Sequence, residues 1–256
     1  MSLELLVSAM NIKNVSKFIS SMNIKSKAII INQTDYNAYE KFDNIDVYSF
    51  SERGVGLSRN NALMRASSDI VVLADDDVHY VDDYEEKIIK AFEEKPDADM
   101  IIFNICSNNP KISLINIKKS RRLNMFNHLK YGGARVAFRL KSQRNNNIFF
   151  SLLFGGGCKY GSGEDTIFIH DFIKSGLKVY TSEVLIGSVD QKESTWFTGY
   201  NEKFFYDKGA LYYYLFGKLS LIFMIRYAYI MRKKTHNLSF FEVLNIMKKG
   251  GKEYYE

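Results

Sequence analysis

The chain has 256 residues, 46% of them hydrophobic, and a formal net charge of +6 at pH 7. This length and composition fit one large globular domain, or a domain with an appendage, and exclude a fibrous or low-complexity chain. Cys106 and Cys158 form no CxxC pair, and the N-terminus has neither a basic region nor an apolar stretch of signal-peptide length. We therefore expect a reduced, cytoplasmic protein.

Short apolar runs alternate with amphipathic segments along the first two thirds of the chain. The predicted strands are 3–10, 28–32, 47–50, 70–74, 100–105 and 177–186. The predicted helices are 15–22 with Asn11 or Asn14 as its cap, 59–66 with Ser58 as its cap, one from an Asp82–Glu85 capping box to Pro96, and 164–174 with Gly176 as its stop. This alternation predicts an α/β fold with a Rossmann-like, mainly parallel sheet flanked by helices.

The segment 210–231 is strongly apolar and aromatic, but Lys218 and Arg226 interrupt it. Two central cations make a membrane span costly, roughly 2.5–3.5 kcal/mol each. Two alternatives stay open. The segment forms either an interfacial helix pair, with Arg232, Lys233 and Lys234 on anionic lipid, or a buried helix that covers the sheet.

The charge is unevenly distributed. No acidic residue occurs between Asp99 and Glu164, whereas lysines and arginines are frequent there. This asymmetry indicates an anionic partner, for which a diphosphate, a membrane face and nucleic acid are the candidates, with a solvated basic surface as the alternative.

Three aspartates, Asp75, Asp76 and Asp77, directly follow the apolar run 70–74. Ligands bind at the carboxyl ends of strands in open α/β sheets, and three adjacent carboxylates exceed what capping requires. Alternation along an extended strand end would send Asp75 and Asp77 to one side and Asp76 to the other. A divalent cation that carries a phosphorylated ligand fits this pair best.

Two glycine-containing segments supply further candidates. The first, Gly-Val-Gly-Leu-Ser-Arg-Asn-Asn-Ala at 54–62, leads into a helix whose first turn carries Arg59, and its amides and guanidinium could face a phosphate. The second contains three glycines at 155–157 and then Gly-Ser-Gly-Glu-Asp-Thr at 161–166. Acids at a helix start are often only caps, but beside a close-approaching ligand Glu164 or Asp165 could take a proton from a hydroxyl.

The order of these motifs, over residues 1–205, resembles a family 2 glycosyltransferase of the GT-A fold, of the small bacterial kind that builds surface polysaccharides such as capsule. The resemblance implies metal-dependent, inverting transfer of a sugar from a nucleotide-diphosphate donor, expected to be a UDP-sugar. The implied acceptor is a hydroxyl of a glycan or of a lipid-diphosphate-linked molecule. The halves 1–115 and 116–205 would bind donor and acceptor, and 206–256 would be a helical extension with possible peripheral membrane contact at the inner face of the cell membrane.

The resemblance also implies roles for individual residues. Asp77 and Asp75 would bind Mn²⁺ or Mg²⁺, and Asp165, in preference to Glu164, would be the general base. The implied nucleotide-sugar contacts are Ser8, Asp35, Arg59, Asn60, Asp75 and Asp76.

Three departures from the family pattern stand out. Asn32 and Gln33 replace the first acid of the loop after the second strand, and a histidine expected near Asp190 is missing. The Q-x-x-R-W signature of processive members is reduced to Trp196. We therefore expect a single-addition enzyme.

Two rival functions are considered. A haloacid-dehalogenase-like phosphatase also has D-x-D after an apolar strand, but here that strand comes late and His79 follows where Thr or Val is expected. A non-enzymatic nucleic-acid-binding module would explain the basic block but not the acidic triplet, so we expect no nucleic-acid partner.

Overall fold

The computed structural model describes residues 1–109, 114–190, 199–235 and 237–255. The elements in chain order are β1 (Leu3–Met10), α1 (Val15–Met22), β2 (Lys27–Gln33), β3 (Ala38–Phe42), β4 (Ile45–Phe50), α2 (Val55–Arg65), β5 (Ile70–Asp75), β6 (Val78–Tyr80), α3 (Tyr84–Glu94), β7 (Met100–Ser107), β8 (Arg121–Arg122), β9 (Val136–Arg139), α4 (Leu140–Asn145), α5 (Glu164–Lys174), β10 (Val179–Val189), α6 (Glu202–Phe216), the 3-10 helix η1 (Gly217–Leu219), α7 (Ser220–Met231) and α8 (Phe240–Tyr255).

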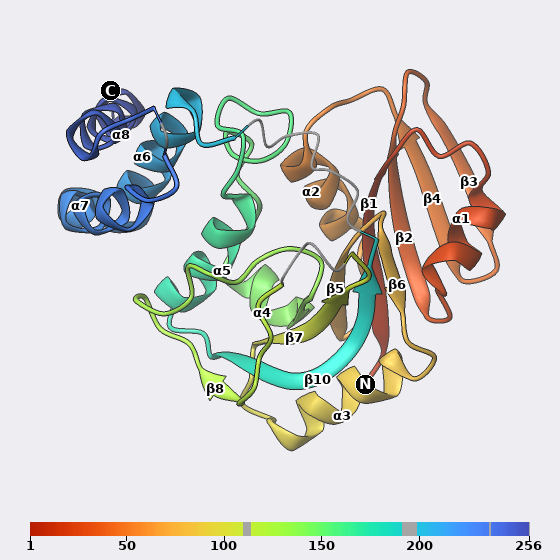
Figure 1. The fold of residues 1–256 in the computed structure, drawn as a ribbon. Helices are drawn as coiled ribbons and strands as arrows, with labels where there is room; N and C mark the ends of the chain where they lie inside the picture. The colour runs from red at the N-terminus through yellow and green to blue at the C-terminus, as the bar shows by residue number, and fades with distance from the viewer. Residues whose placement is uncertain (110–113, 191–198, 236, 256) are drawn as a thin grey trace.

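The strands form one mixed sheet in the order β3-β4-β2-β1-β5-β9-β7-β10-β6, with β8 paired to β10 (Figure 1). Strands β4, β2, β1 and β5 are parallel, whereas β9 runs antiparallel between β5 and β7. All six predicted strands are present. The strands that the sequence did not predict, β3, β6, β8 and β9, have only 2 to 5 residues, too few for a periodic pattern to be seen.

Helices cover both faces of the sheet (Figure 1). Side chains alternate along β2, so that Ala28 and Ile30 join the apolar cluster beneath α1 and α3, while Ile29 and Ile31 join the cluster beneath α2 and α5. A strand buried on both faces reads as a continuous apolar run, which is why β1, β2 and β5 were predictable.

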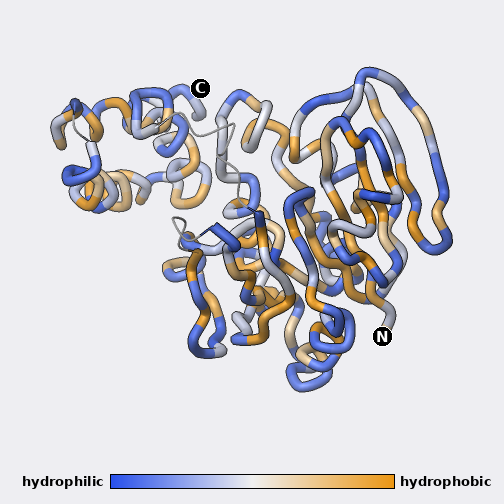
Figure 2. Tube along the Cα trace, turned by 45° about the vertical axis from the view of Figure 1, so that its right-hand side comes forward, coloured by the Kyte–Doolittle hydropathy of each residue, from blue (hydrophilic) through white to orange (hydrophobic). Residues whose placement is uncertain are grey.

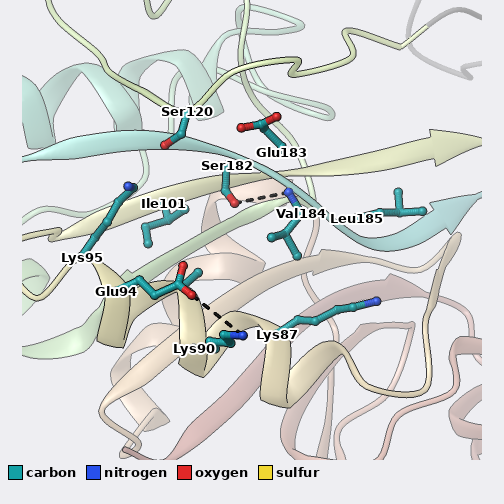
Figure 3. A pocket seen from close by; sticks show the side chains of 11 residues that line it. Lys87, Lys90, Glu94, Lys95, Ile101, Ser120, Ser182, Glu183, Val184 and Leu185 are labelled. Atoms are coloured by element: carbon teal, nitrogen blue, oxygen red, sulfur yellow. Dashed lines mark hydrogen bonds and ion pairs between the residues drawn. The ribbon is translucent and has the colours of Figure 1, made fainter.

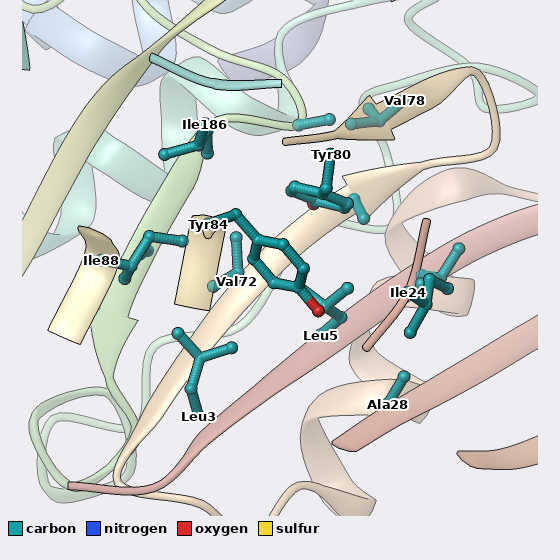
Figure 4. Packing of buried hydrophobic residues seen from close by; sticks show 14 of the residues in the cluster. Leu3, Leu5, Ile24, Ala28, Val72, Val78, Tyr80, Tyr84, Ile88 and Ile186 are labelled. Atoms are coloured by element: carbon teal, nitrogen blue, oxygen red, sulfur yellow. The ribbon is translucent and has the colours of Figure 1, made fainter. Parts of the chain in front are cut away.

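The cluster under α3 is anchored by a polar contact as well as by apolar packing (Figure 4). Tyr84 is fully buried among aliphatic side chains, and its hydroxyl donates to Ser26 Oγ at 2.7 Å. The backbone N–H of Ser26 donates back to the same hydroxyl at 2.9 Å. These two hydrogen bonds satisfy the buried tyrosine hydroxyl as donor and acceptor, and they hold α3 against the start of β2.

The predicted helix starts are partly correct. Asn14, one of the two predicted caps, caps α1 by accepting a hydrogen bond from the N–H of Lys17 at 2.9 Å. The other two caps are wrong. Helix α2 begins at Val55, so Ser58 lies inside it, and α3 has no side-chain cap because the Asp82 carboxylate pairs with Lys25 instead.

The C-terminal helices α6, α7 and α8 form a bundle beside the sheet, at the left of Figure 1, with an apolar core of their own. Figure 2 shows apolar segments along the central strands and again in this bundle. Helices α6 and α8 cross very closely. A Cβ at Gly209 would lie 1.9 Å from Met247 O, and one at Gly250 would lie 2.0 Å from Tyr206 O. The alternative of a helix that covers the sheet is therefore wrong.

Among the described residues, one helical stretch, Glu202–Met231, is long and apolar enough to cross a membrane by length and composition. It is interrupted at η1, where Gly217 has φ 51°. The two parts have 15 and 12 residues, fewer than the roughly 20 that a straight span of a bilayer requires. The geometry therefore does not favour a single membrane-spanning helix.

Candidate active site

The aspartate triplet lies where β5 ends and turns into β6. Asp75 is the last residue of β5 and pairs in register with Ser8 of β1, whereas Asp76 and Asp77 form the turn that leads to Val78. The argument from strand alternation is therefore wrong, because the backbone is extended only as far as Asp75. Of the three carboxylates, that of Asp75 pairs with Arg59.

Arg59 forms ion pairs with three acidic side chains of the site. Its side chain is only 3% exposed, and its Nη2 donates to Asp75 Oδ1 at 2.9 Å. Its Nη1 donates to Asp165 Oδ1 at 2.6 Å and to Glu164 Oε1 at 3.2 Å. One buried guanidinium thus joins the end of β5 to the start of α5, and the two acidic motifs of the sequence meet at a single point.

Glycines surround the Glu164–Asp165 pair. Asp165 Oδ2 accepts from the N–H of Gly133 at 2.8 Å, and a Cβ at Gly132 would lie 3.0 Å from Asp165 Cβ. Gly155 has φ 111°, and a Cβ there would meet the Glu164 carboxyl at 3.0 Å. Gly155 is required by its positive φ and by this crowding, and a side chain at Gly132 would press on Asp165.

The charges of this cluster shift its ionisation. Burial is the largest influence on Asp165 and raises the pKa of its carboxyl, because the charges of Glu164 and Asp75 together with burial outweigh the opposing effect of Arg59. Burial alone would lower the pKa of Arg59, but the three carboxylates hold it above its usual value. A carboxyl with a raised pKa is suited to accept a proton near neutral pH.

Asp77 is the second residue of the turn, and its side chain is exposed. Partial burial, followed by the charges of Asp75 and Asp76, raises its pKa to about 6, and Asp190 acts in the same direction. The backbone of Asp190 lies alongside, since its N–H donates to Asp77 O at 3.1 Å. A bound cation would relieve this concentration of negative charge.

The residues fit a metal that is shared with a ligand. Among the described residues no three His, Cys, Asp or Glu side chains are grouped so as to enclose an ion. Mg²⁺ and Mn²⁺ commonly use one or two carboxylates and take their other ligands from water and phosphate. Asp77, with Asp75 beside it, matches that requirement.

The structure places the remaining predicted residues as follows. The buried Ser8 accepts from Ser58 Oγ at 3.0 Å, and Asn60 Nδ2 donates to Phe150 O at 2.9 Å. Asp35 lies in the exposed loop after β2, where Arg53 pairs with it at 2.7 Å. Trp196 lies outside the described residues.

Sequence reasoning missed Lys208 of α6 and Asp190. Lys208 is partly buried, and burial lowers its pKa while the charges of Glu164 and Asp207 oppose that effect. It occurs within an apolar stretch far from Glu164 in the chain, so no spacing signal could have revealed it. Asp190 follows β10 and reaches the turn only through β6–β10 pairing.

The basic block between Asp99 and Glu164 is partly structural. Arg135 donates to Ile115 O at 2.9 Å, Arg139 to Ala98 O at 2.8 Å, and Arg144 to Ala66 O at 2.6 Å. These three guanidinium groups donate to backbone carbonyls of the chain itself. Fewer basic side chains are therefore available to bind an anionic partner than the charge of the block suggests.

A cavity of about 440 Å³ lies between α3 and the irregular part of β10 (Figure 3). Its lining includes Lys87, Lys90 and Lys95 along one side and the residues from Ser182 to Leu185 along the other. None of the predicted site residues lines it, so it is separate from the carboxylate cluster.

Residues 28–155, half of the chain, match the family described as Glycosyl transferase family 2. The chain belongs to this family. The match includes Arg59 and the aspartate triplet and ends at Gly155. The protein is therefore a glycosyltransferase, and the comparison supports neither a phosphatase nor a nucleic-acid-binding module.

Solved structures support the GT-A fold of this glycosyltransferase. TarS 1–349 of S. aureus in complex with UDP-GlcNAc is 15% identical with a TM-score of 0.64, over 91% of this chain and 74% of that chain. The complex of TarS 1–349 with UDP gives 15% identity, a TM-score of 0.62, and coverages of 91% and 73%. No curated protein sequence matches the chain significantly.

Proposed function

We propose that this family 2 enzyme is a metal-dependent, inverting and non-processive glycosyltransferase. It moves a sugar from a UDP-sugar to a hydroxyl of a glycan or lipid-linked acceptor in surface-polysaccharide synthesis. The observation that carries the proposal is the convergence of Asp75 and the Glu164–Asp165 pair on Arg59. The UDP-GlcNAc complex of the similarly folded TarS supports a UDP-sugar donor.

Asp165 is the general base in this proposal. It removes the proton of the acceptor hydroxyl, whose oxygen forms a bond to the anomeric carbon as the bond from that carbon to the diphosphate breaks. Attack from the face opposite the leaving group inverts the configuration. Asp165 is preferred to Glu164 because its pKa is raised and the Gly133 N–H orients it at 2.8 Å.

Asp77 and Asp75 would hold Mn²⁺ or Mg²⁺. When bound, such a cation supplies charge neutralisation for the diphosphate leaving group. Arg59 keeps Asp75 in place beside it, since the 2.9 Å contact fixes that carboxylate in the direction of α2. Ser8, Asp35, Asn60 and Asp76 would contribute to donor binding around this point.

We also propose that 1–115 binds the donor and 116–205 the acceptor, with 206–256 as a helical extension at the inner face of the cell membrane. The described cysteines are unpaired thiols, which agrees with a reducing, cytoplasmic compartment.

The test is release of UDP from a panel of UDP-sugars with Mn²⁺, and thermal shift identifies the donor that binds. Asp77→Asn should abolish metal-dependent release, whereas Asp82→Asn, an equally small change at an exposed acid, should leave it intact. Phosphate release from a generic phosphate ester without UDP release from any UDP-sugar would overturn the proposal.

A further inference from the structure

The exposed face of α7 is unusually apolar for a protein surface. Its inward stripe, Ser220, Met224, Ala228 and Met231, is buried against the bundle. The opposite face and the preceding η1 expose Leu219, Leu221, Ile222, Ile225, Tyr229 and Ile230, each between 41 and 64%. Contiguous apolar surface of this kind marks an interaction site.

The same face is basic. No acidic residue occurs from Lys208 to Phe241. Within that stretch Arg226 lies on the outward side of α7, and Arg232, Lys233 and Lys234 follow its last turn, all exposed. The Arg232 guanidinium lies 3.6 Å from the centroid of the Tyr229 ring, so cation and aromatic ring form one surface.

The apolar face continues beyond α7. Phe126, 72% exposed, stacks on Phe223 with ring centroids 6.4 Å apart, and Phe223 stacks on Phe216 at 3.7 Å. Phe126 belongs to the second stretch that has no acidic residues, and Arg121 and Arg122 of β8 are exposed within it. Two distant parts of the chain thus supply the same combination of apolar and basic side chains.

From these observations we propose that α7, with Phe126 at its edge, lies flat on an anionic lipid bilayer. This inference rests on the proposed function, in which 206–256 is a helical extension, and names anionic lipid as the partner of that extension. Aliphatic side chains, an aromatic ring at headgroup depth and lysines beside them are the composition of interfacial helices. A second copy of this chain fits the face poorly, because two such surfaces would bring like charges together.

Helix α7 is linked to the reaction site through α6, which precedes it in the chain. Asp207 of α6 accepts from the N–H of Gly161 at 2.9 Å, and Leu211 contacts Gly163, where an added Cβ would lie 2.9 Å away. Helix α6 therefore packs on the loop that directly precedes Glu164 and Asp165 at the start of α5. The base at the start of α5 is thus connected to α7 through α6, which would hold the reaction site near an acceptor in the bilayer.

The experiment is flotation of the full chain with vesicles of phosphatidylcholine alone and of phosphatidylcholine mixed with phosphatidylglycerol. The protein should float with the anionic vesicles only, and high salt should weaken binding. Ile222→Ser with Ile225→Ser should reduce partitioning about tenfold. Lys233→Gln with Lys234→Gln should reduce it by about fivefold for each lysine.

Matched controls lie elsewhere on the surface. Leu185→Ser with Tyr39→Ser removes two side chains that are 40% and 54% exposed, and Lys87→Gln with Lys90→Gln removes two charges on α3. Both should bind vesicles like the unchanged protein. Circular dichroism and UDP-sugar binding verify that each variant folds.

Two results would overturn the membrane proposal. One is equal binding to both kinds of vesicle, or to neither. The other is a dimer in sedimentation that dissociates in the Ile222→Ser, Ile225→Ser variant while vesicle binding is unchanged. UDP release is measured separately, so loss of transferase activity with intact flotation would count only against the proposed reaction.

Discussion

Arg59 Nη1 and Asp165 Oδ1 lie 2.6 Å apart, although the two residues are 106 positions apart in the chain. The same guanidinium holds Asp75 and Glu164, so a single cation balances three carboxylates. The site therefore keeps an excess of negative charge, and its stability and ionisation both depend on Arg59.

Replacement of Arg59 should lower the stability of the fold and make it depend on pH. Arg59→Met leaves three carboxylates without their buried cation, and we expect a loss of about 3–5 kcal/mol in the free energy of unfolding at neutral pH. Their folded-state pKa values would then exceed the unfolded ones, so the folded state takes up protons and stability recovers as the pH falls below about 7. Urea denaturation at several pH values measures this. Arg65→Met, on the same helix, should show no such recovery.

Asp165→Asn should lower kcat by about 10²–10⁴-fold with little change in donor affinity, because a general base acts on the acceptor. Single-turnover kinetics and donor titration separate the two quantities. Asp171→Asn, on the same helix, should keep near-normal turnover, and Glu164→Gln compares the neighbouring acid directly. A large loss of donor affinity in Asp165→Asn would reassign this residue to donor binding.

Metal binding should depend on pH through Asp77. Its pKa is raised to about 6, and protons compete with the cation for the carboxylate. Affinity for Mn²⁺ should therefore be constant above that value and fall by about tenfold for each pH unit below it. Calorimetric titration between acidic and neutral pH tests this. A profile unchanged in Asp77→Asn would contradict the assignment.

The two buried histidines should make the fold sensitive to acid. His170 Nδ1 lies 3.3 Å from His128 Nε2, and burial, with His128 and Lys174 nearby, lowers the pKa of His170 from 6.5 to about 4. The unfolded chain binds this proton first, so stability is lost as the pH falls from 6.5 to about 4, by about 3 kcal/mol. Chemical denaturation should find a smaller acid loss in His170→Asn than in His79→Asn, whose histidine is exposed.

The glycine crossing of α6 and α8 can be tested with neighbouring residues. Gly250→Ala would place a Cβ 2.0 Å from Tyr206 O, and we expect a loss of about 1–3 kcal/mol in stability. Gly251→Ala meets chiefly the flexible end of Met224 at 3.0 Å and gains helix propensity of up to about 1 kcal/mol. Thermal unfolding compares them, and equal effects would argue against the close crossing.

The sequence was informative where one signal had one structural meaning. The apolar run before Asp75 could only be a buried strand, and it is β5. Helix α5 follows its acidic start and its apolar stripe as expected. The family resemblance implied roles for Asp75, Glu164 and Asp165 in one reaction, and the structure brings these side chains together around Arg59.

Other features depend on tertiary contacts that no local pattern encodes. The four-residue strand β9 is held in place by β5 and β7 on either side, and Asp76 and Asp77 turn because β6 pairs with β10. Arg59 was expected near the nucleotide, but its burial among carboxylates could not be read from its position at a helix start. The charge of Glu164 acts on Lys208 because α6 packs on the loop before α5.

The close crossing at Gly209 and Gly250 prevents α6 from sliding along α8. Helix α6 contacts Gly161 through Asp207 and runs nine residues further to Phe216, a rise of about 14 Å, before η1 and α7 begin. If α7 rests on a bilayer, this length acts as a fixed spacer that sets the height of the reaction centre above the lipid. Acceptors would then be selected by how far their hydroxyl projects from the membrane as well as by their chemistry.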